Sequence, residues 1–141
     1  MLLSATNLSL PSKDMEVEFW DDFPGMIMRR ALDPQREGSP SFRMSLVTLE
    51  PGVATPRHVH ERSDEGWYVI SGSGIFHAGG RTLRCQAGDF LYAPRRFPHQ
   101  VINDGAEPFH YVAVTAPPCD FEGDNKVTEV YDPATHHRIT G

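Results

Sequence analysis

Short strand-like segments, separated by proline and glycine, follow one another through most of this chain. Phe42–Glu50 (FRMSLVTLE) alternates in polarity and ends at Pro51-Gly52, a dipeptide that favours a turn. Gly66–Gly72 (GWYVISG) is rich in the aromatic and β-branched residues that strands prefer. Residues 73–86 are a predicted hairpin, because Gly79-Gly80 can supply the positive φ angles of a tight turn. Further segments of this kind are Gly88–Pro94, His99–Asn103 and Pro108–Pro118, and Glu16–Leu32 is predicted to form one or two strands broken at Pro24-Gly25.

No stretch of about twelve residues has a helical period, so the pattern predicts an all-β fold. Many short strands at intervals of about ten residues are typical of a β-sandwich or an antiparallel β-barrel. The length of 141 residues suits one domain. We expect residues 1–14 to be a flexible N-terminal segment and residues 15–118 to form the barrel domain. Residues 119–141 are expected to be a tail that packs on the barrel or on a partner subunit, with an edge strand within Val127–Pro133.

The composition argues against several classes of protein. The formal net charge is −6 and the basic residues are scattered, whereas nucleic-acid-binding proteins present a basic face. No apolar stretch approaches the roughly 18 residues that span a bilayer, and no basic residue precedes Lys13, so neither a membrane helix nor a signal peptide is predicted. Cys85 and Cys119 are too few for a disulfide framework. A reduced, cytoplasmic location is the simplest expectation.

Three histidines and a glutamate form the pattern with the clearest chemical meaning. His58 and His60 are two residues apart, so in a strand both imidazoles leave the same face. Glu65 follows after the polar stretch Glu61–Asp64, which is predicted to turn the chain so that Glu65 faces the same point from a neighbouring strand. His99, which opens another predicted strand, supplies a third imidazole.

This ligand set carries one negative charge when the imidazoles are neutral. Mixed nitrogen and oxygen donors of this kind bind a divalent transition metal ion, and Fe, Mn, Ni, Cu and Zn all suit them. Four protein ligands leave two positions of an octahedral ion open, and open positions distinguish catalytic metal sites from closed structural ones. The sequence therefore predicts one metal ion per chain, bound by His58, His60, Glu65 and His99. Glu65 is also a candidate catalytic group that takes a proton during turnover.

The spacing of these residues resembles the two sequence motifs of the cupin superfamily. The first motif reads G-x5-H-x-H-x4-E-x6-G and is carried by Gly52, His58, His60, Glu65 and Gly72. The second reads G-x5-P-x4-H-x3-N and is carried by Gly88, Pro94, His99 and Asn103. The resemblance covers residues 42–116. The short connection between the two motifs resembles that of small single-domain cupins. The resemblance implies an antiparallel jelly-roll β-barrel, a homodimer, and a divalent metal held inside the barrel by His58, His60, Glu65 and His99.

One position departs from the cupin pattern. The second motif usually has glycine two residues after Pro94, and here that residue is Arg96. A glycine there normally supplies a left-handed turn, and an arginine in the same conformation costs on the order of 1 kcal/mol. The loop that leads to His99 therefore contains either a strained arginine or a different turn.

Other residues are candidates for the cavity of such a barrel. Trp67 shares the parity of Glu65, and aromatic lining suits an apolar or aromatic ligand, while ordinary core packing is the alternative for each apolar residue. His110 is a candidate catalytic proton shuttle, because the pKa of a histidine lies near neutrality, or else an ordinary strand histidine. The candidate cavity residues are Arg43, Met44, Leu46, Trp67, Tyr92 and Phe97.

Three functions are compatible with these residues. The leading hypothesis is a metal-dependent enzyme with dioxygenase-type chemistry on a small organic substrate, which the resemblance permits. The second is non-redox, with the metal as a Lewis acid in a polyketide cyclase, an isomerase or a lyase. The third is a small-molecule binding or sensor protein without turnover, since a fold does not fix a function. In each case the expected partner is a small molecule rather than nucleic acid or a membrane.

Overall fold

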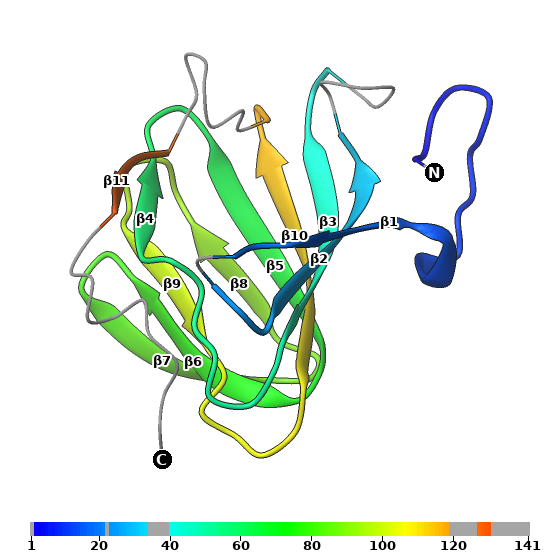
Figure 1. Cartoon of the computed structure of the whole chain (residues 1–141). Helices are drawn as coiled ribbons and strands as arrows, with labels where there is room; N and C mark the ends of the chain where they lie inside the picture. Colours follow the sequence, from blue (N-terminus) through cyan, green and yellow to red (C-terminus); the bar gives the residue numbers. More distant parts are fainter. Residues whose placement is uncertain (1, 22, 34–39, 119–126, 131–141) are drawn as a thin grey trace.

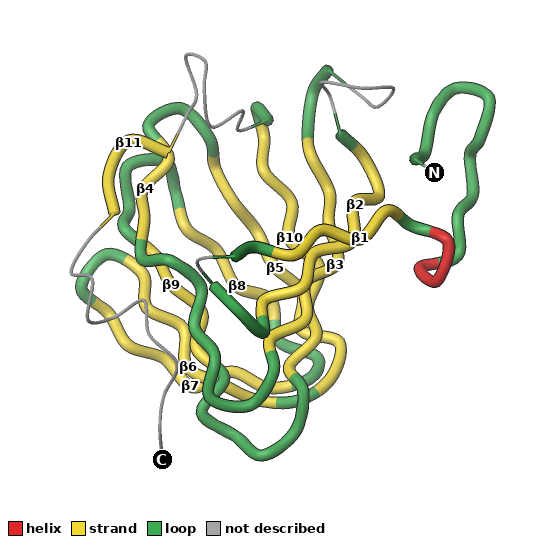
Figure 2. The backbone as a smooth tube through the Cα atoms, in the orientation of Figure 1, coloured by secondary structure: helices red, strands yellow, loops and turns green. Residues whose placement is uncertain are grey.

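A computed structural model describes residues 2–21, 23–33, 40–118 and 127–130 (Figure 1). Figure 2 shows strands joined by loops and one short 3-10 helix, η1 (Ser12–Asp14). No helix in the described part of the chain is long and apolar enough to cross a membrane. The strands are β1 (Glu16–Phe19), β2 (Met26–Leu32), β3 (Arg43–Leu49), β4 (His58–His60), β5 (Asp64–Ser71), β6 (Ser73–Ala78), β7 (Arg81–Gln86), β8 (Phe90–Ala93), β9 (His99–Ile102), β10 (Phe109–Ala116) and β11 (Val127–Val130).

The strands form two antiparallel sheets that face each other (Figure 1). One sheet has the order β1-β2-β3-β10-β5-β8, and the other has the order β11-β4-β9-β6-β7. The chain passes repeatedly from one sheet to the other, so that β4 and β5, although consecutive, lie in different sheets. The same is true of β8 and β9. The all-β antiparallel fold predicted from the sequence is confirmed.

The core lies between the two sheets and follows from the alternation of each strand. On β3 every second residue is buried, including Val47 and Leu49, and on β10 the buried residues are Phe109, Tyr111 and Thr115. The rings of Trp67 on β5 and Phe76 on β6 meet across the two sheets, with centroids 5.0 Å apart in an edge-to-face arrangement. Contacts between buried rings of this kind fix the separation of the sheets.

Gly72 is the point at which the chain leaves one sheet and enters the other, between β5 and β6. Its φ is +86°, and a Cβ there would lie 2.5 Å from the carbonyl oxygen of Pro108. A glycine is needed for both reasons, because other residues rarely adopt this φ and any side chain would collide with the backbone. The motif glycine at this position therefore has a steric cause.

Asn103, the last residue of the second motif, is fully buried and holds the turn between β9 and β10. Its side-chain amide donates hydrogen bonds to the carbonyl oxygens of Leu49 and Glu107, at 3.0 and 2.8 Å. Its Oδ1 accepts a hydrogen bond from the backbone N–H of Gly105 at 3.0 Å. Asn103 thus satisfies buried backbone groups and has no part in the ligand set.

The two ends of the chain meet the sheets in different ways. Near the N-terminus, Leu2 is buried and the backbone N–H of Leu3 donates a hydrogen bond to the carbonyl oxygen of Ala31, at 2.9 Å. Near the C-terminus, β11 pairs with β4 at the edge of its sheet, which confirms the edge strand predicted within Val127–Pro133. The rest of the predicted tail, residues 119–126 and 131–141, lies outside the described residues.

Candidate metal centre

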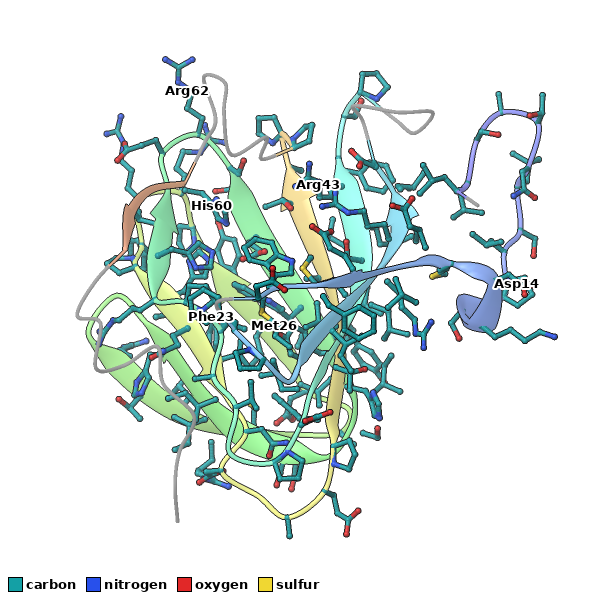
Figure 3. The ribbon with its side chains drawn as sticks, in the orientation of Figure 1. Asp14, Phe23, Met26, Arg43, His60 and Arg62 are labelled. Atoms are coloured by element: carbon teal, nitrogen blue, oxygen red, sulfur yellow. The ribbon has the colours of Figure 1, made fainter. Side chains whose placement is uncertain are left out.

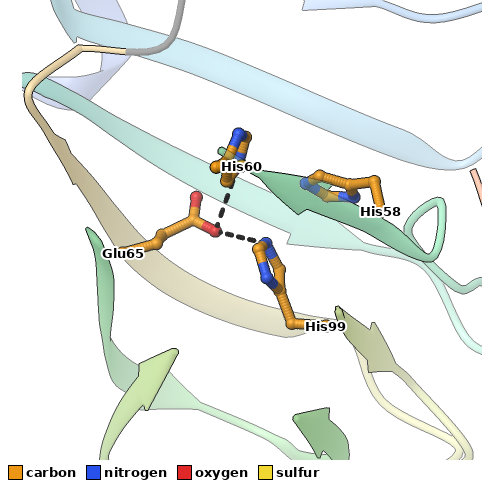
Figure 4. A group of neighbouring side chains, drawn as sticks. All are labelled: His58, His60, Glu65 and His99. Carbon is orange, nitrogen blue, oxygen red and sulfur yellow. Dashed lines mark ion pairs between the residues drawn. The ribbon is translucent and has the colours of Figure 1, made fainter. Parts of the chain in front are cut away.

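The four predicted metal ligands come from three strands and from both sheets (Figure 4). His58 and His60 are the first and last residues of β4, and their shared parity turns both imidazoles inward. His99 opens β9 and is paired directly with His58. Glu65 lies on β5 in the opposite sheet, and the turn formed by residues 61–63 brings it across to face the histidines.

The ligand atoms of these residues lie within 4.8 Å of one another. The ring centroids are 4.8 Å apart for His58 and His60, 4.5 Å for His58 and His99, and 5.1 Å for His60 and His99. Oε2 of Glu65 lies 2.9 Å from Nε2 of His99 and 3.8 Å from Nε2 of His60. The four side chains therefore converge on one small volume.

Backbone carbonyl groups orient two of the imidazoles. Nδ1 of His58 donates a hydrogen bond to the carbonyl oxygen of Pro56 at 2.8 Å, and Nδ1 of His99 donates one to the carbonyl oxygen of Phe97 at 2.9 Å. With a proton on Nδ1, each ring turns an unprotonated Nε2 towards the cluster. Hydrogen bonds of this kind fix the tautomer and the orientation of metal-binding histidines.

Burial and mutual repulsion keep two of the histidines neutral. The pKa of His58 is lowered from 6.5 to about 3, mainly by burial and also by the neighbouring His99 and His60. Burial also lowers the pKa of His60, although Glu65 opposes the shift. Neutral imidazoles are the form in which histidine binds metal ions.

Glu65 and His99 shift each other's pKa values in opposite directions. Burial alone would raise the pKa of the Glu65 carboxyl, but its close contact with His99 and the charges of the three rings hold that pKa below its usual value. Burial alone would lower the pKa of His99, but the same contact with Glu65 raises it. Glu65 is therefore a carboxylate at neutral pH, which gives the cluster its negative charge.

The residues fit a divalent metal ion. Nε2 of His99, which faces the cluster, is a buried ring nitrogen with no hydrogen-bond partner of good geometry among the described residues. Buried polar atoms are rarely left in this state in native proteins, and a bound ion is one common explanation. Three imidazole nitrogens and one carboxylate oxygen are donors that Fe, Mn, Ni, Cu and Zn accept.

The cluster lies in the wall of a cavity of about 370 Å³ between the two sheets, a size typical of small-molecule sites. Figure 3 labels four residues of its lining, Phe23, Met26, Arg43 and His60. Aromatic and aliphatic side chains make up much of the rest. The other lining residues are Trp20, Met28, Ser45, Val47, Thr55, Pro56, His58, Glu65, Trp67, His99, Val101, Tyr111, Ala113 and Thr115.

Two of the six candidate cavity residues, Arg43 and Trp67, line this cavity. Met44 and Leu46 are not among the lining residues, because they lie on the outer face of β3. The buried residues of this strand are Arg43, Ser45, Val47 and Leu49. The alternation of β3 is as predicted, but the structure turns its more polar set inward. An apolar outer set therefore faces away from the cavity.

Tyr92, Phe97 and His110 are likewise not among the lining residues. Tyr92 on β8 is 61% exposed and Phe97 is 46% exposed. Nδ1 of His110 lies 2.8 Å from the hydroxyl oxygen of Thr48, its neighbour on β3, so its ring has a partner on the outer face of the sheet. His110 is thus not brought to the metal ligands.

Several lining residues were not predicted from the sequence. Trp20 and Phe23 come from the connection between β1 and β2, and Met26 and Met28 come from β2 itself. The alternation of methionines in Met26–Leu32 was the available signal for an inward face. Tyr111 is buried on β10, and burial raises the pKa of its hydroxyl well above the usual value, as does the nearby Glu65 charge.

Arg96 adopts the left-handed conformation that the family pattern assigns to glycine. Its φ is 69°, and it is the non-glycine residue with positive φ within the described ranges. Its backbone N–H donates a hydrogen bond to the carbonyl oxygen of His60 at 2.8 Å. The turn before His99 therefore has the usual geometry with a strained arginine, and the ligand keeps its place.

Comparison with known proteins agrees with the fold and the site. The profile of the cupin domain family matches residues 45–115, which is half of the chain and contains all four ligands. An uncharacterized protein of Methanocaldococcus jannaschii is 27% identical over 105 residues, which cover 74% of this chain and 83% of that protein. The oxalate decarboxylase OxdC of Bacillus subtilis is 37% identical over 81 residues, which cover 54% of this chain but 21% of that enzyme.

Among solved structures, the polyketide cyclase RemF of Streptomyces resistomycificus superposes with a TM-score of 0.70 at 22% identity, over 89% of this chain and 88% of the cyclase. This likeness concerns the fold. Together with the match of the family profile, which spans the ligands and both motifs, it establishes what kind of domain this is. The chain belongs to the cupin domain family.

Proposed function

We propose that this cupin is a metal-dependent enzyme that acts on a small organic substrate, by dioxygenase-type chemistry. The observation that carries the proposal is the convergence of His58, His60, Glu65 and His99 on the wall of an apolar cavity of about 370 Å³. Four protein ligands leave coordination positions free, as catalytic metal sites require. A redox-active ion bound by these residues would supply electron transfer to O₂, and a redox-inert ion would supply Lewis acidity.

The protein's own groups would bind, orient and protonate the substrate. Trp67 and Met28 offer apolar surface that excludes water and contacts an aromatic or aliphatic body. Glu65 lines the cavity as a carboxylate, so it can accept a proton from a substrate and return it later in the reaction. The hydroxyl of Tyr111 stays protonated because of its raised pKa, and it can donate a hydrogen bond to a substrate oxygen.

A non-redox reaction is the second candidate, and it is favoured by the names of similar proteins. A relative with 37% identity is an oxalate decarboxylase, and a polyketide cyclase has the same fold. In this reading the metal would polarise a carbonyl group, and no O₂ would be consumed. The identity of the bound metal separates the two candidates.

The experiment is elemental analysis of protein purified without added metal, combined with O₂ uptake on a panel of aromatic diols, diketones and thiols. Iron together with O₂ uptake supports the dioxygenase. Zinc without O₂ uptake, with turnover of a carbonyl substrate, supports the cyclase, isomerase or lyase. If the protein contains metal but turns over no substrate of the panel, both enzymatic candidates are contradicted. A binding or sensor protein then remains.

The ligand assignment is tested separately with His99→Ala, which removes one ligand. We expect its metal content to fall severely compared with the wild-type protein. His77→Ala is the matched control, because His77 is a histidine on β6 that contacts Thr82 rather than the cluster. Equal metal content in the two variants would show that His99 is not a ligand.

A further inference from the structure

Arg43 and Glu65 lie in one row across the inner face of the six-stranded sheet. Thr115 on β10 is paired with Arg43 on one side and with Glu65 on the other. Neighbouring strands are about 4.8 Å apart, so the backbones of Arg43 and Glu65 are separated by about 10 Å. All three residues line the cavity. A ligand of a few bonds in length can therefore reach from Arg43 to the metal centre.

The next row along the sheet holds a buried hydroxyl group that points to a ligand. Ser45 is paired with Ala113, which is paired in turn with Trp67. Ser45 is 3% exposed and lines the cavity, and its Oγ has no hydrogen-bond partner among the described residues. An unpartnered buried hydroxyl is costly, and a polar ligand group beside Ser45 would satisfy it.

The charges at the cavity favour an anion. Among the described residues that line it, Arg43 and Glu65 carry the charges, since the ligand histidines are neutral when they bind a metal. A divalent ion would add two positive charges and leave the lining cationic. Nη2 of Arg43 lies 3.7 Å from Oδ1 of Asp33. Asp33 also forms an ion pair with Arg30, whose Nη1 lies 3.0 Å from Oδ2. Apolar walls screen such charges less than water does.

We propose that the cavity takes a small organic carboxylate with an apolar, ring-sized body, its carboxylate held by Arg43 and Ser45 and its other end at the metal centre. The planar guanidinium matches a carboxylate in shape, and the Ser45 hydroxyl donates a second hydrogen bond. Trp67, Phe23 and Met28 contact the body. This inference names the substrate class and rests on the proposed function. A ligand of this class differs from oxalate, which has two carboxylates and no apolar part.

The test uses metal-loaded protein and isothermal titration with three probes: 3-phenylpropionate, its neutral amide 3-phenylpropionamide, and oxalate. We expect the wild-type protein to bind the aryl carboxylate about tenfold more tightly than the amide, as a charge-assisted hydrogen bond implies. It should also prefer the aryl carboxylate to oxalate. Arg43→Met should abolish the preference for carboxylate over amide, and Arg43→Lys should restore part of it.

Ser45→Ala is the second variant, because it removes one hydroxyl and leaves the buried charges in place. It should weaken binding of 3-phenylpropionate several-fold and binding of the amide by less, because a hydrogen bond to a charged acceptor is the stronger of the two. Met44→Leu is the matched control, since Met44 is on the same strand but does not line the cavity, and it should change neither affinity.

Each outcome bears on one proposal. Equal affinity of the wild-type protein for 3-phenylpropionate and its amide would overturn the inference, as would tighter binding of oxalate. Failure of the metal-loaded protein to bind 3-phenylpropionate at millimolar concentration would overturn it as well. Metal content is measured on every sample. Protein that binds metal but does not discriminate between the probes contradicts the carboxylate site alone, whereas protein that binds no divalent metal contradicts the proposed function.

Discussion

Glu65 and His99 reach each other from opposite sheets, with Oε2 of the glutamate 2.9 Å from Nε2 of the histidine. The other two ligands, His58 and His60, lie in the same sheet as His99. An ion held by all four residues would therefore link the two sheets across the cavity. We therefore expect metal binding to stabilise the barrel.

Removal of the metal should lower the thermal unfolding midpoint. An ion present at about a hundredfold its Kd stabilises the folded state by about 2.7 kcal/mol, provided that the unfolded chain does not bind it. Differential scanning fluorimetry of metal-loaded and chelator-treated protein measures the shift. His99→Ala should show a much smaller shift on addition of chelator. The same midpoint before and after verified metal loss would contradict the coupling.

The metal-free protein should lose stability on acidification. The pKa of His58 falls from 6.5 to about 3 on folding, so between these pH values the unfolded chain binds a proton that the folded chain does not. Each such proton lowers the free energy of unfolding by about 1.4 kcal/mol per pH unit as the pH falls. His60 acts in the same direction, and His99, whose pKa is raised, acts in the opposite one.

Urea denaturation of chelator-treated protein across this pH range measures the effect. His58→Gln removes the histidine whose pKa falls to about 3, so the variant should show a shallower loss of stability towards acid. His77→Gln is the control at an exposed contact on β6. A pH dependence identical in His58→Gln and the wild-type protein would refute the assignment.

Arg96→Gly should stabilise the protein by about 0.5–1 kcal/mol, because the relief of left-handed strain exceeds the added entropy of the unfolded chain. Loss of the arginine side chain should cost little stability, because its ion pair with Glu61, at 3.7 Å, is exposed to solvent. Chemical denaturation measures the change. Arg95→Gly is the control and should destabilise, because Arg95 does not have positive φ and its guanidinium contacts the Asp64 carboxylate. A less stable Arg96→Gly variant would contradict the strain.

Gly74→Ala should destabilise the barrel by about 1–3 kcal/mol, as overpacking does. A Cβ at Gly74 would collide with the carbonyl oxygen of Ile102 on β9, the strand that His99 opens. We therefore expect a lower metal affinity as well. Gly66→Ala is the matched control, because its Cβ would have Leu91 O at 3.8 Å as the nearest atom. Equal stability of the two variants would argue against close packing of β6 on β9.

The strands and the ligand cluster could be predicted from the sequence because each has a local signal. Proline and glycine punctuate the strands, and the parity of His58 and His60 requires no knowledge of the partner strands. The position of Glu65 followed from the polar turn before it. Spacing in the second motif then identified His99, which no local pattern joins to the others.

The lining of the cavity was harder to predict, because it depends on which face of each strand turns inward. On β3 the more apolar set contains Met44 and Leu46, yet the structure turns Arg43 and Ser45 to the interior. Hydrophobicity is a poor guide on this strand, because its inner face combines polar cavity residues with the core residues Val47 and Leu49. The contribution of Trp20 depends on how the β1–β2 hairpin adds to the sheet edge, which only the tertiary structure reveals.

The cavity is assembled from two parts of the chain that differ in their relation to the cupin family. Residues 45–115, which match the family profile, contain every metal ligand, whereas Arg43 and the lining residues of β1–β2 precede them. Substitutions in the first 44 residues can therefore reshape what the cavity accepts without touching the ion. We accordingly expect substitutions at Arg43 and on β2 to change ligand preference in this chain and to leave its metal content unchanged.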